Sequence, residues 1–593
     1  MAPLTAPCAL VHDATTGRWL AYRDACRVVI ARCLADVLPA LASVAEAVER
    51  DGLHAAGFVS YEAASAFDPA LPAKTDPEFP LLWFVLCSAP EVVTVHPAAA
   101  AVEMPALEWT RSITPEHYRS AFDRVRAYIA AGDTYQVNLT HRLHARAQLE
   151  PFELFGRLIA AQQASYGAFV DTGEWVLCSA SPELFFRLDG DRIESRPMKG
   201  TAARGLWYAD DCNRANELRA SPKDRAENIM IVDMVRNDIG RIADVGTVAV
   251  TELCATERYP TVWQMVSHVT ARTQAPLTEI FSAIFPPASI TGAPKRRTME
   301  IIDELESTPR RVYTGAIGFV APGRRAQFNV AIRTVLIDRR ASRAEYGVGG
   351  GVVWDSQCER EWEECQVKAR VLRPVPAEFR LLETLLWKPG SGYWLVEEHI
   401  QRLRESAAYF CFAIDTDAVE ESLREAAGKF GGTPHRVRLL VGRAGEIGIE
   451  PTPLTGTVQG FGDVRLACAP VDASNPFLYH KTTNRRIYTE ALQSCPGSAD
   501  VILFNERGAV TESTIANIAV EVDGTLCTPP VQCGLLPGTY RAHLLAQGEM
   551  EERMIDIATL LNSPRVYLFN SVRGMHRVNV IADENLPSLS EPP

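Results

Sequence analysis

Two lysines stand in sequence contexts that could do chemistry. Lys199 lies in SRPMKGT, downstream of Glu183 in SASPELFF, and Lys481 lies in YHKTTNR, upstream of Glu512 in VTESTIANI. A lysine amine becomes a nucleophile when its pKa is lowered, and a carboxyl group held nearby can accept or donate a proton. Most lysines are surface residues, so each of these two needs support from the motifs around it.

Acidic residues in the first half could hold a cation. Glu361, Glu364 and Lys368 recur at helical spacing on one face of an expected helix, and Glu227 lies on another. Carboxylates from two helices can hold Mg²⁺, which keeps several waters and accepts oxygen atoms from a substrate. On spacing alone, a solvated helix face with a Glu364–Lys368 pair explains the same pattern.

Three consecutive glycines interrupt an expected strand. Gly349, Gly350 and Gly351 lie in YGVGGGVV. Their backbone N–H groups could approach a carboxylate with no β-carbon in the way. A bulge or tight turn would produce the same pattern, so the glycines alone do not indicate a site.

Several elements are expected to position these residues. Thr114 and Ser221 are expected to cap two helices, each with proline at its first position. Helices are predicted over 114–132, 221–242 and 361–372, and strands over 81–87, 135–143, 325–338 and 345–355. The proline-containing segment after residue 372 predicts domains over 1–373 and 378–593, joined by a linker over 374–377. The tail over 585–593 is expected to be disordered.

Size and composition narrow the class of protein. A chain of 593 residues is too long for one core. The net charge of −13 argues against nucleic-acid or anionic-membrane partners. The 14 cysteines show no paired or metal-ligand spacing, which fits a reduced cytoplasmic setting. Neither a signal peptide nor an apolar run of about 18 residues is present, so no membrane span is expected.

The motifs of the first half occur in one order that resembles a known family. DTYQVNLTHRL, SASPELFF, SRPMKGT, ENIMIVDMVRND, FPPASITGAPKRRTMEIIDE, YTGAIGF, FNVAIRTV, GVGGGVV and EREWEECQVKA follow one another over about 115–372. This series resembles the chorismate-utilising enzymes, which include the component I chains of anthranilate synthase and aminodeoxychorismate synthase and, more distantly, the isochorismate synthases.

The resemblance implies roles for individual residues. Lys199 would be a nucleophile that forms a covalent adduct with the substrate ring, and Glu183 a general acid/base. Glu227, Glu361 and Glu364 would hold Mg²⁺ against a carboxylate of chorismate. The substrate would be oriented by Thr291, Gly292, Tyr313, Arg333, Gly349, Gly350, Gly351 and Lys368.

A few positions separate the branches of this family. Isochorismate-type enzymes are expected to carry a lysine base where this chain has Gln136. Anthranilate synthases usually read PIAGT where this chain reads PMKGT, so Lys199 favours the aminodeoxychorismate branch. Relatives often carry a histidine where this chain has Gln264, and His268 does not align with it. Gln264 cannot relay a proton, so no residue is assigned to carry a proton to the C4 hydroxyl.

The family adds ammonia to chorismate, usually with a partner. The chain shows no glutaminase segment with a nucleophilic cysteine, so the resemblance implies a separate glutamine amidotransferase subunit or free ammonia. It also shows no clear tryptophan-binding element near its N-terminus, so feedback by tryptophan is not expected.

The second half carries the parts of a pyridoxal site. Such a site needs a lysine for the Schiff base, an acid beside the pyridine nitrogen and a phosphate cradle, which GLLPGTYR could provide at the start of a helix. The order HIQRLRESA, YHKTTNR, ESTIAN, LCTPP, GLLPGTYR resembles the fold-type IV pyridoxal-phosphate enzymes, which include aminodeoxychorismate lyase.

This second resemblance also assigns residues. Lys481 would form the Schiff base, Glu512 would face the pyridine nitrogen, and Ser571 and Arg573 would face phosphate or substrate carboxylate. Further cofactor contacts would come from Arg402, Asn517, Gly538 and Thr539. The usual N-terminal strand with its DRG and YGDG elements is missing. Members of the family usually pair through this domain, so a homodimer is expected.

Together the resemblances predict a mixed α/β chain. The first half would be a sandwich with large antiparallel sheets, and the second a two-subdomain, aminotransferase-like unit. The leading hypothesis is a bifunctional enzyme that converts chorismate into 4-aminobenzoate by amination at C4 and loss of pyruvate. The alternatives are anthranilate synthesis fused to another aminotransferase, or a fusion in which the second half has lost activity.

Overall fold

The computed structural model describes residues 5–95, 107–147, 150–372, 378–455 and 460–581. The chain divides into two compact units, which are described separately below: residues 1–204 with 214–375, and residues 205–213 with 376–593. The predicted linker over 374–377 and the predicted tail over 585–593 lie outside the described residues. No helix in the described ranges is long and apolar enough to cross a membrane.

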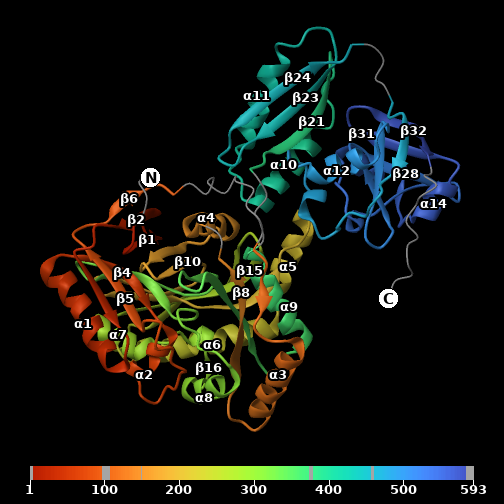
Figure 1. The fold of residues 1–593 in the computed structure, drawn as a ribbon. Helices are drawn as coiled ribbons and strands as arrows, with labels where there is room; N and C mark the ends of the chain where they lie inside the picture. The colour runs from red at the N-terminus through yellow and green to blue at the C-terminus, as the bar shows by residue number, and fades with distance from the viewer. Residues whose placement is uncertain (1–4, 96–106, 148–149, 373–377, 456–459, 582–593) are drawn as a thin grey trace. The chain divides into compact units, whose positions relative to one another are not determined.

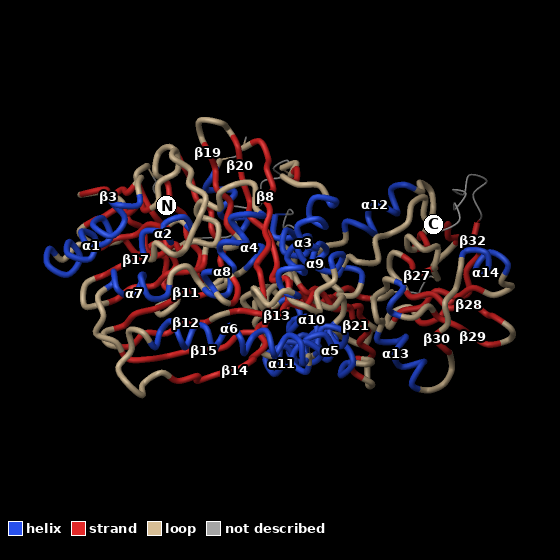
Figure 2. Tube along the Cα trace, turned by 90° about the horizontal axis from the view of Figure 1, so that it is seen from below, coloured by secondary structure: helices blue, strands red, loops and turns tan. Residues whose placement is uncertain are grey.

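The first unit contains two ten-stranded sheets in which the strand pairs are antiparallel (Figure 1). The first sheet consists of β16 (Gly292–Ala293), β8 (Gln136–Arg146), β20 (Arg343–Val352), β19 (Thr334–Asp338), β10 (Trp175–Ser181), β9 (Tyr166–Asp171), β1 (Cys8–Asp13), β2 (Arg18–Tyr22) and β6 (Glu91–Val93), with β7 (Thr110–Arg111) beside β8. The second consists of β13 (Met198–Ala203), β15 (Val262–Arg272), β12 (Arg192–Arg196), β11 (Leu184–Asp189), β18 (Arg325–Val330), β17 (Ala316–Ala321), β4 (His54–Val59), β5 (Leu82–Cys87) and β3 (Arg27–Ala31), with β14 (Ala249–Arg258) beside β15 (Figure 2).

Apolar side chains from both sheets meet in one core. Val11 and Leu177 of the first sheet pack in the same cluster as Phe58 and Val85 of the second. Strands with this period-two pattern bury one face against the partner sheet. The predicted sandwich with large antiparallel sheets is therefore confirmed.

Helices cover the outer faces of this sandwich. α1, α6 and α7 share a core with the second sheet, whereas α4 packs on the first sheet and α3, α8 and α9 pack around β8 and β20. In Figure 1, α1 runs beside β4 and β5. The bounds are α1 (Leu34–Asp51), α2 (Ala64–Phe67), α3 (Pro115–Ala130), α4 (Pro151–Gln162), α6 (Pro222–Gly240), α7 (Leu277–Ile284), α8 (Lys295–Leu305) and α9 (Cys358–Lys368).

The predicted caps are confirmed. The Thr114 hydroxyl accepts a hydrogen bond from the backbone N–H of His117 at 3.3 Å, and Ser221 accepts one from Asp224 at 3.2 Å. Each cap satisfies a backbone donor that the first helical turn leaves free. Ser221 thereby fixes the start of α6, the helix that carries Glu227.

The single strand predicted over 325–338 is wrong. The structure has two strands, β18 and β19, and they belong to different sheets. Arg333 lies between them with a φ of 51°. A left-handed residue ends a strand, because its backbone leaves the extended region.

The second unit has two smaller sheets. One is antiparallel and consists of β22 (Gly392–Tyr393), β21 (Leu381–Lys388), β23 (His435–Val441) and β24 (Ile447–Pro453). The other is mixed and consists of β27 (Val510–Ser513), β26 (Asp500–Phe504), β25 (Asp463–Leu466), β32 (Gly574–Ile581), β31 (Val566–Asn570), β28 (Asn517–Val522), β29 (Thr525–Thr528) and β30 (Glu551–Glu552). The helices are α10 (Val396–Phe410), α11 (Thr416–Ala427), α12 (Arg486–Ser494), α13 (Thr539–Ala546) and α14 (Ile557–Asn562). Separate apolar cores under the two sheets match the two predicted subdomains.

A short segment from the first half of the sequence belongs to this second unit. Residues 205–213, which include the start of α5 (Tyr208–Ala220), group with residues 376–593. The Trp207 ring stacks on that of Tyr479 at 5.5 Å between centroids, and the Tyr409 hydroxyl donates to the carbonyl of Gly205 at 2.8 Å. The sequence offered no indication of this, because the segment lies inside the motif series of the first family.

Candidate active sites

The first unit contains a cavity of about 500 Å³ that collects most of the predicted residues. Its lining comes from β8, β13, α6, β15, β20, α9 and neighbouring loops. The predicted residues in the lining are Glu183, Lys199, Glu227, Tyr313, Arg333, Gly349, Gly351, Glu361, Glu364 and Lys368. Asn138, Lys223, Ser289 and Arg360 also line it and were not predicted.

Three predicted substrate contacts lie behind this lining. Thr291 is fully buried next to Ile290, which lines the cavity, and Gly292 pairs with Val137 at the edge of the first sheet. A β-carbon at Gly350 would meet Glu361 Oε2 at 2.9 Å. These positions support the cavity wall, and their predicted contact with substrate stays a prediction.

Glu183 is a buried carboxyl directly before β11. Its Oε1 accepts hydrogen bonds from the Ser289 hydroxyl at 2.6 Å and from the backbone N–H of Met198 at 3.4 Å. Burial raises the pKa of Glu183 to about 7, although these two donors and the nearby Lys199 and Arg333 oppose the rise. A carboxyl group with a pKa near neutrality can both donate and accept a proton.

Lys199 lies at an irregular point of β13. The register with β15 shifts between Met198 and Thr201, and Gly200 has a φ of 99°, which favours glycine. A β-carbon built on Gly351 would lie 2.0 Å from Lys199 Nζ. The Lys199 amine therefore occupies space that only a glycine at position 351 leaves free. Making room for this amine is a role of Gly351 that is separate from substrate binding.

Gln136 lies beside the same amine. A β-carbon at Gly351 would lie 3.1 Å from the Gln136 side-chain amide. Gln136 is fully buried, and neither its Oε1 nor its Nε2 has a hydrogen-bond partner among the described residues. Buried amides are normally paired, so the unpaired amide next to Lys199 is an exception.

Three predicted metal ligands face the cavity from two helices. Glu361 of α9 accepts a hydrogen bond from the Ser356 hydroxyl at 2.7 Å, Glu364 pairs with Lys368 at 2.6 Å, and Glu227 of α6 lies 3.8 Å from Lys223. Burial raises the pKa of both Glu227 and Glu361, and the neighbouring Glu364 adds to the rise at Glu361.

These carboxylates fit a cation that is held only in part by protein. Among the described residues, no group of three His, Cys, Asp or Glu side chains is arranged to hold a metal ion by itself. Mg²⁺ usually binds through one or two carboxylates and keeps water or substrate oxygens in its other positions. The raised pKa values of Glu227 and Glu361 show that their charged forms are disfavoured, and a bound cation would stabilise those charges.

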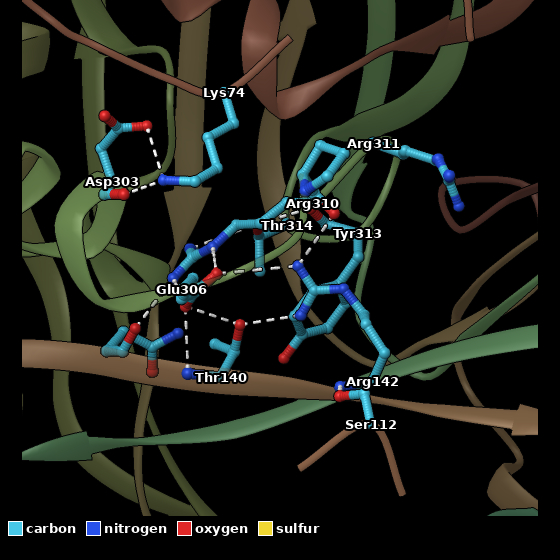
Figure 3. A network of polar contacts seen from close by, with 12 residues as sticks. Lys74, Ser112, Thr140, Arg142, Asp303, Glu306, Arg310, Arg311, Tyr313 and Thr314 are labelled. Carbon is cyan, nitrogen blue, oxygen red and sulfur yellow. Dashed lines mark hydrogen bonds and ion pairs between the residues drawn. The ribbon is translucent and has the colours of Figure 1, made fainter. Parts of the chain in front are cut away.

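Tyr313 packs against a glycine and an arginine, and Figure 3 shows its ring next to Arg142. A β-carbon at Gly347 would lie 2.2 Å from the Tyr313 ring, and the Arg142 guanidinium stands 5.0 Å from the ring centroid. Gly347 and Arg142 face each other across β20 and β8. Glu306 and Arg310, 2.7 Å apart and both buried, complete the charges of this network. These two contacts form a clamp on the Tyr313 ring, which no motif of the sequence indicated.

The second unit contains its own cavity, of about 410 Å³. The predicted residues in its lining are Arg402, Lys481, Glu512, Asn517, Gly538, Thr539, Ser571 and Arg573. Arg436, Arg438, Arg485 and Tyr488 also line it and were not predicted. Arg436 and Arg438 lie two residues apart on β23 and so share a face, and this alternation could have been read from HRVRLLV.

Lys481 is a partly buried amine. Burial and the nearby Arg402 lower the pKa of Lys481 to about 8, although Glu383 opposes the change. The carbonyl of Lys481 accepts from the backbone N–H of Leu382 at 3.0 Å, which ties its loop to β21. An amine with this pKa is partly neutral near pH 8 and can add to an aldehyde.

Glu512 is the one acidic side chain in the described lining of this cavity. It accepts hydrogen bonds from the Tyr488 hydroxyl at 2.8 Å, the backbone N–H of Leu536 at 3.1 Å and the Asn517 amide at 3.4 Å. Burial raises the pKa of Glu512 to about 7. A fixed carboxyl group of this kind fits the ring nitrogen of pyridoxal phosphate.

A cradle for a phosphate lies at the start of α13. Gly538 precedes the helix, and a β-carbon there would lie 1.9 Å from Asn517 Oδ1. The hydroxyls of Thr539 and Ser571 lie 3.2 Å and 3.1 Å from His399 Nε2. Backbone N–H groups at a helix start favour an anion. The residues of this cavity therefore fit pyridoxal phosphate.

Arg402 is held by a buried partner in this structure. Its guanidinium donates to both oxygens of Glu383, at 2.9 Å and 2.6 Å, and to the carbonyl of Pro537 at 3.1 Å. Burial alone would raise the pKa of Glu383, but Arg402 and His399 lower it to about 2. Arg402 thus lines the cavity with its orientation fixed, as a phosphate contact requires.

Comparison with known proteins matches each half of the chain to a different family. Residues 6–374 match the family described as chorismate binding enzyme, and residues 380–581 match amino-transferase class IV. Aminodeoxychorismate synthase of Streptomyces griseus is 43% identical over 270 residues, which cover 45% of this chain and 36% of that protein. An anthranilate synthase component 1 of Haloarcula marismortui is 41% identical over 273 residues, which cover 46% of this chain and 55% of that protein.

A solved structure shows the same fold in the first unit. Anthranilate synthase component I from Streptococcus pneumoniae TIGR4 superposes with a TM-score of 0.52 at 23% identity, and the match covers 63% of this chain and 94% of that one. The chain spans between about a third and just over half of the length of the two curated relatives. The family match covers more than half of the chain, so the chain belongs to the chorismate binding enzymes and carries an amino-transferase class IV domain after that part.

Proposed function

We propose that this chain converts chorismate into 4-aminobenzoate in two steps, one in each unit. The first step would replace the C4 hydroxyl of chorismate by an amino group. The second would eliminate pyruvate from the resulting aminodeoxychorismate. The observation that carries the proposal is that Lys199 and the buried Glu183 share the cavity of a chorismate binding enzyme.

The first cavity has the charges that chorismate requires. Chorismate carries two carboxylates, and Arg333 and Lys368 line the cavity as cations. Lys368 Nζ is held by the carbonyl of Gly349 at 2.8 Å. Glu227, Glu361 and Glu364 would hold Mg²⁺, whose charge would bind a substrate carboxylate. Tyr313, with a pKa raised to about 12 by burial, stays protonated and can donate a hydrogen bond.

Lys199 and Glu183 would carry out the first reaction. The Lys199 amine would form a bond to the ring while the C4 hydroxyl departs as water with a proton from Glu183. Ammonia would then add at C4 and release the lysine. Atoms balance, because one ammonia enters and one water leaves. Lys199 in PMKGT favours aminodeoxychorismate over anthranilate as the product. Sequence identity does not separate the two, since an aminodeoxychorismate synthase and an anthranilate synthase match this chain about equally.

Ammonia would come from a separate glutamine amidotransferase. The relative from Haloarcula marismortui is named as component 1, which implies a second component for that protein. Free ammonia should replace the partner in vitro, so the first step can be assayed without it.

The second cavity has the charges that aminodeoxychorismate requires. Arg436, Arg438 and Arg573 line it and could take the two carboxylates of this substrate. The chemistry that pyridoxal phosphate supplies when bound is an electron sink next to the substrate amine. Glu512 would keep the ring nitrogen protonated, and Lys481 would move the proton at the carbon that bears the amine. Loss of pyruvate leaves an aromatic ring, and the stability of that ring favours elimination over transamination.

A product assay tests the proposal most directly. The intact chain, with chorismate, ammonia, Mg²⁺ and pyridoxal phosphate, is expected to release 4-aminobenzoate and pyruvate. Anthranilate as the product would contradict the first step. Accumulation of aminodeoxychorismate without pyruvate would contradict the second and indicate another aminotransferase activity or a lost one.

Variants assign the steps to the two lysines. Lys199→Ala is expected to abolish aminodeoxychorismate formation with ammonia, and unchanged turnover would remove its covalent role. Lys481→Ala is expected to lose the absorbance of bound pyridoxal phosphate while aminodeoxychorismate still forms. Lys429→Ala, an exposed lysine of the second unit, is the control and should change neither readout.

A further inference from the structure

The first unit contains another cavity, of about 370 Å³, that the proposed function does not use. Its lining includes Trp362 and Gln366 of α9, the helix whose residues Glu361 and Glu364 line the first cavity. The two linings have no residue in common. α9 therefore presents one set of side chains to each cavity.

A buried histidine with an unpaired ring nitrogen lies in the wall of this cavity. His141 is 4% exposed, and its Nδ1 has no hydrogen-bond partner among the described residues. Burial and the nearby Arg142 and Arg111 lower the pKa of His141 to about 4, so the ring is neutral at physiological pH. A buried polar atom left unpaired costs free energy, which a bound molecule with a hydrogen-bonding group would recover.

An arginine and two indole rings complete the chemistry of the cavity. The Arg111 guanidinium stands 5.0 Å from the centroid of Trp362, and the His141 ring stacks on Trp362 at 5.2 Å with an angle of 23°. Trp109 lines the cavity as well. In the described part of the chain, Arg111 has no hydrogen bond or ion pair to a carboxylate. A guanidinium beside flat aromatic walls is suited to an anion attached to a ring.

The cavity has no partner for a positive charge. Its described lining contains no aspartate or glutamate. A ligand with an ammonium group would lose hydration there and gain no counter-charge, which disfavours aromatic amino acids. A neutral aromatic amine or hydroxyl would not have this cost, and His141 could bond to it.

We propose that this cavity is a second binding site, which takes a flat aromatic monocarboxylate. Arg111 binds the carboxylate, Trp109 and Trp362 contact the ring, and His141 bonds to a neutral polar substituent. The site differs from the first cavity, which has Arg333 and Lys368 for carboxylates and three glutamates for a metal.

Calorimetric titration of the full-length protein with benzoate tests the site. Arg111→Met should weaken benzoate binding at least tenfold, since it removes the charge and keeps much of the side-chain volume. Arg111 is exposed, so the variant should fold. Arg126→Met is the matched control, because Arg126 stands 4.7 Å over Trp354 in a similar pair outside this lining. It should leave benzoate binding unchanged.

Two further arms separate this site from the first cavity and define the ligand class. Arg333→Met should leave benzoate binding unchanged; if it weakens binding and Arg111→Met does not, the anion binds in the first cavity and the proposal is overturned. Cyclohexanecarboxylate and L-phenylalanine should each bind at least tenfold more weakly than benzoate. Equal affinity for L-phenylalanine, or no benzoate binding at millimolar concentration, would also overturn it.

Discussion

At the scale of single residues, the buried carboxyl groups determine how the protein responds to pH. The pKa of Glu183 is raised from its ordinary value to about 7 because the side chain is buried. A carboxyl group with a raised folded-state pKa contributes stability that is full below about pH 4.5 and is lost as the pH rises through about 7. Above pH 7 the folded protein therefore carries a disfavoured charge at Glu183.

Glu183→Gln should remove this dependence. The glutamine can still accept the hydrogen bond from Ser289 but cannot ionise. The variant and the wild type should have similar melting temperatures at pH 5, whereas at pH 8 the variant should be more stable, by up to about 3 kcal/mol. Thermal unfolding at the two pH values measures this, with the exposed Glu279→Gln as control. A difference that does not change with pH would contradict the raised pKa.

Glu306 shows the opposite case, a buried carboxylate that must stay charged. Burial opposes its charge, but Arg310 and Arg142 hold its pKa below the ordinary value. Glu306→Gln would leave two buried guanidinium groups without a counter-charge and should lower the free energy of unfolding by about 3–5 kcal/mol. Thermal unfolding is the measurement.

The same helix offers the control for this change. Glu304 of α8 is ion-paired with Arg124, but its side chain is 43% exposed, so Glu304→Gln should cost under about 1 kcal/mol. Equal losses in the two variants would show that burial does not decide the cost.

At the scale of elements, β20 controls the position of the proposed nucleophile. A β-carbon at Gly351 would lie 2.0 Å from Lys199 Nζ, which is the mobile end of a side chain, whereas at Gly349 it would meet the backbone of Leu139 at 2.4 Å. Gly351→Ala should therefore leave the fold intact and displace the amine. A displacement of about 1 Å can cost on the order of 100-fold in rate.

Turnover of chorismate with ammonia is the measurement for Gly351→Ala. We expect a loss of about 100-fold with an unchanged melting temperature. Gly156→Ala in α4 is the control, since a β-carbon there meets nothing within 4 Å. If Gly351→Ala retains full activity, the position of the Lys199 amine beside Gly351 is not needed for turnover. That result would count against Lys199 as the nucleophile.

The elements also show which features a sequence can predict. The caps at Thr114 and Ser221 were predictable because a cap depends on residues a few positions apart. The end of β18 was not, because Arg333 adopts a left-handed conformation that arginine rarely takes and that no local pattern indicates. The clamp on Tyr313 could not be predicted because Gly347 and Arg142 are far apart in the sequence. They become neighbours only through the pairing of β20 with β8.

In the candidate sites, too, the residues inside short motifs were predictable, and those brought together by the fold were not. Family motifs identified the lysines and most of the carboxyl groups, because those residues lie inside short ordered motifs. The motifs did not include Arg436 and Arg438, although their alternation on β23 places both in the second cavity. Nor did they indicate that residues 205–213 fold with the second unit, where Trp207 stacks on Tyr479, two residues before Lys481.

At the scale of the whole molecule, each proposed step has its own cavity. Every described residue that lines the first cavity belongs to the first unit, and every one that lines the second belongs to the second. Lys199 does not line the second cavity, and Lys481 does not line the first. A chain that lacks one lysine should therefore keep the activity of its other unit.

Mixing two inactive variants tests this independence. Lys199→Ala should form no aminodeoxychorismate, and Lys481→Ala should accumulate it, so neither alone should release 4-aminobenzoate. A mixture of the two should release it after a lag, because aminodeoxychorismate made by one chain can diffuse to another. The lag should shorten as the concentration of the Lys199→Ala chain rises, and the double variant added to either single variant is the control. A mixture no more active than its parts would mean that the intermediate passes only within one chain, and that the two units depend on each other in a way that their separate cavities do not require.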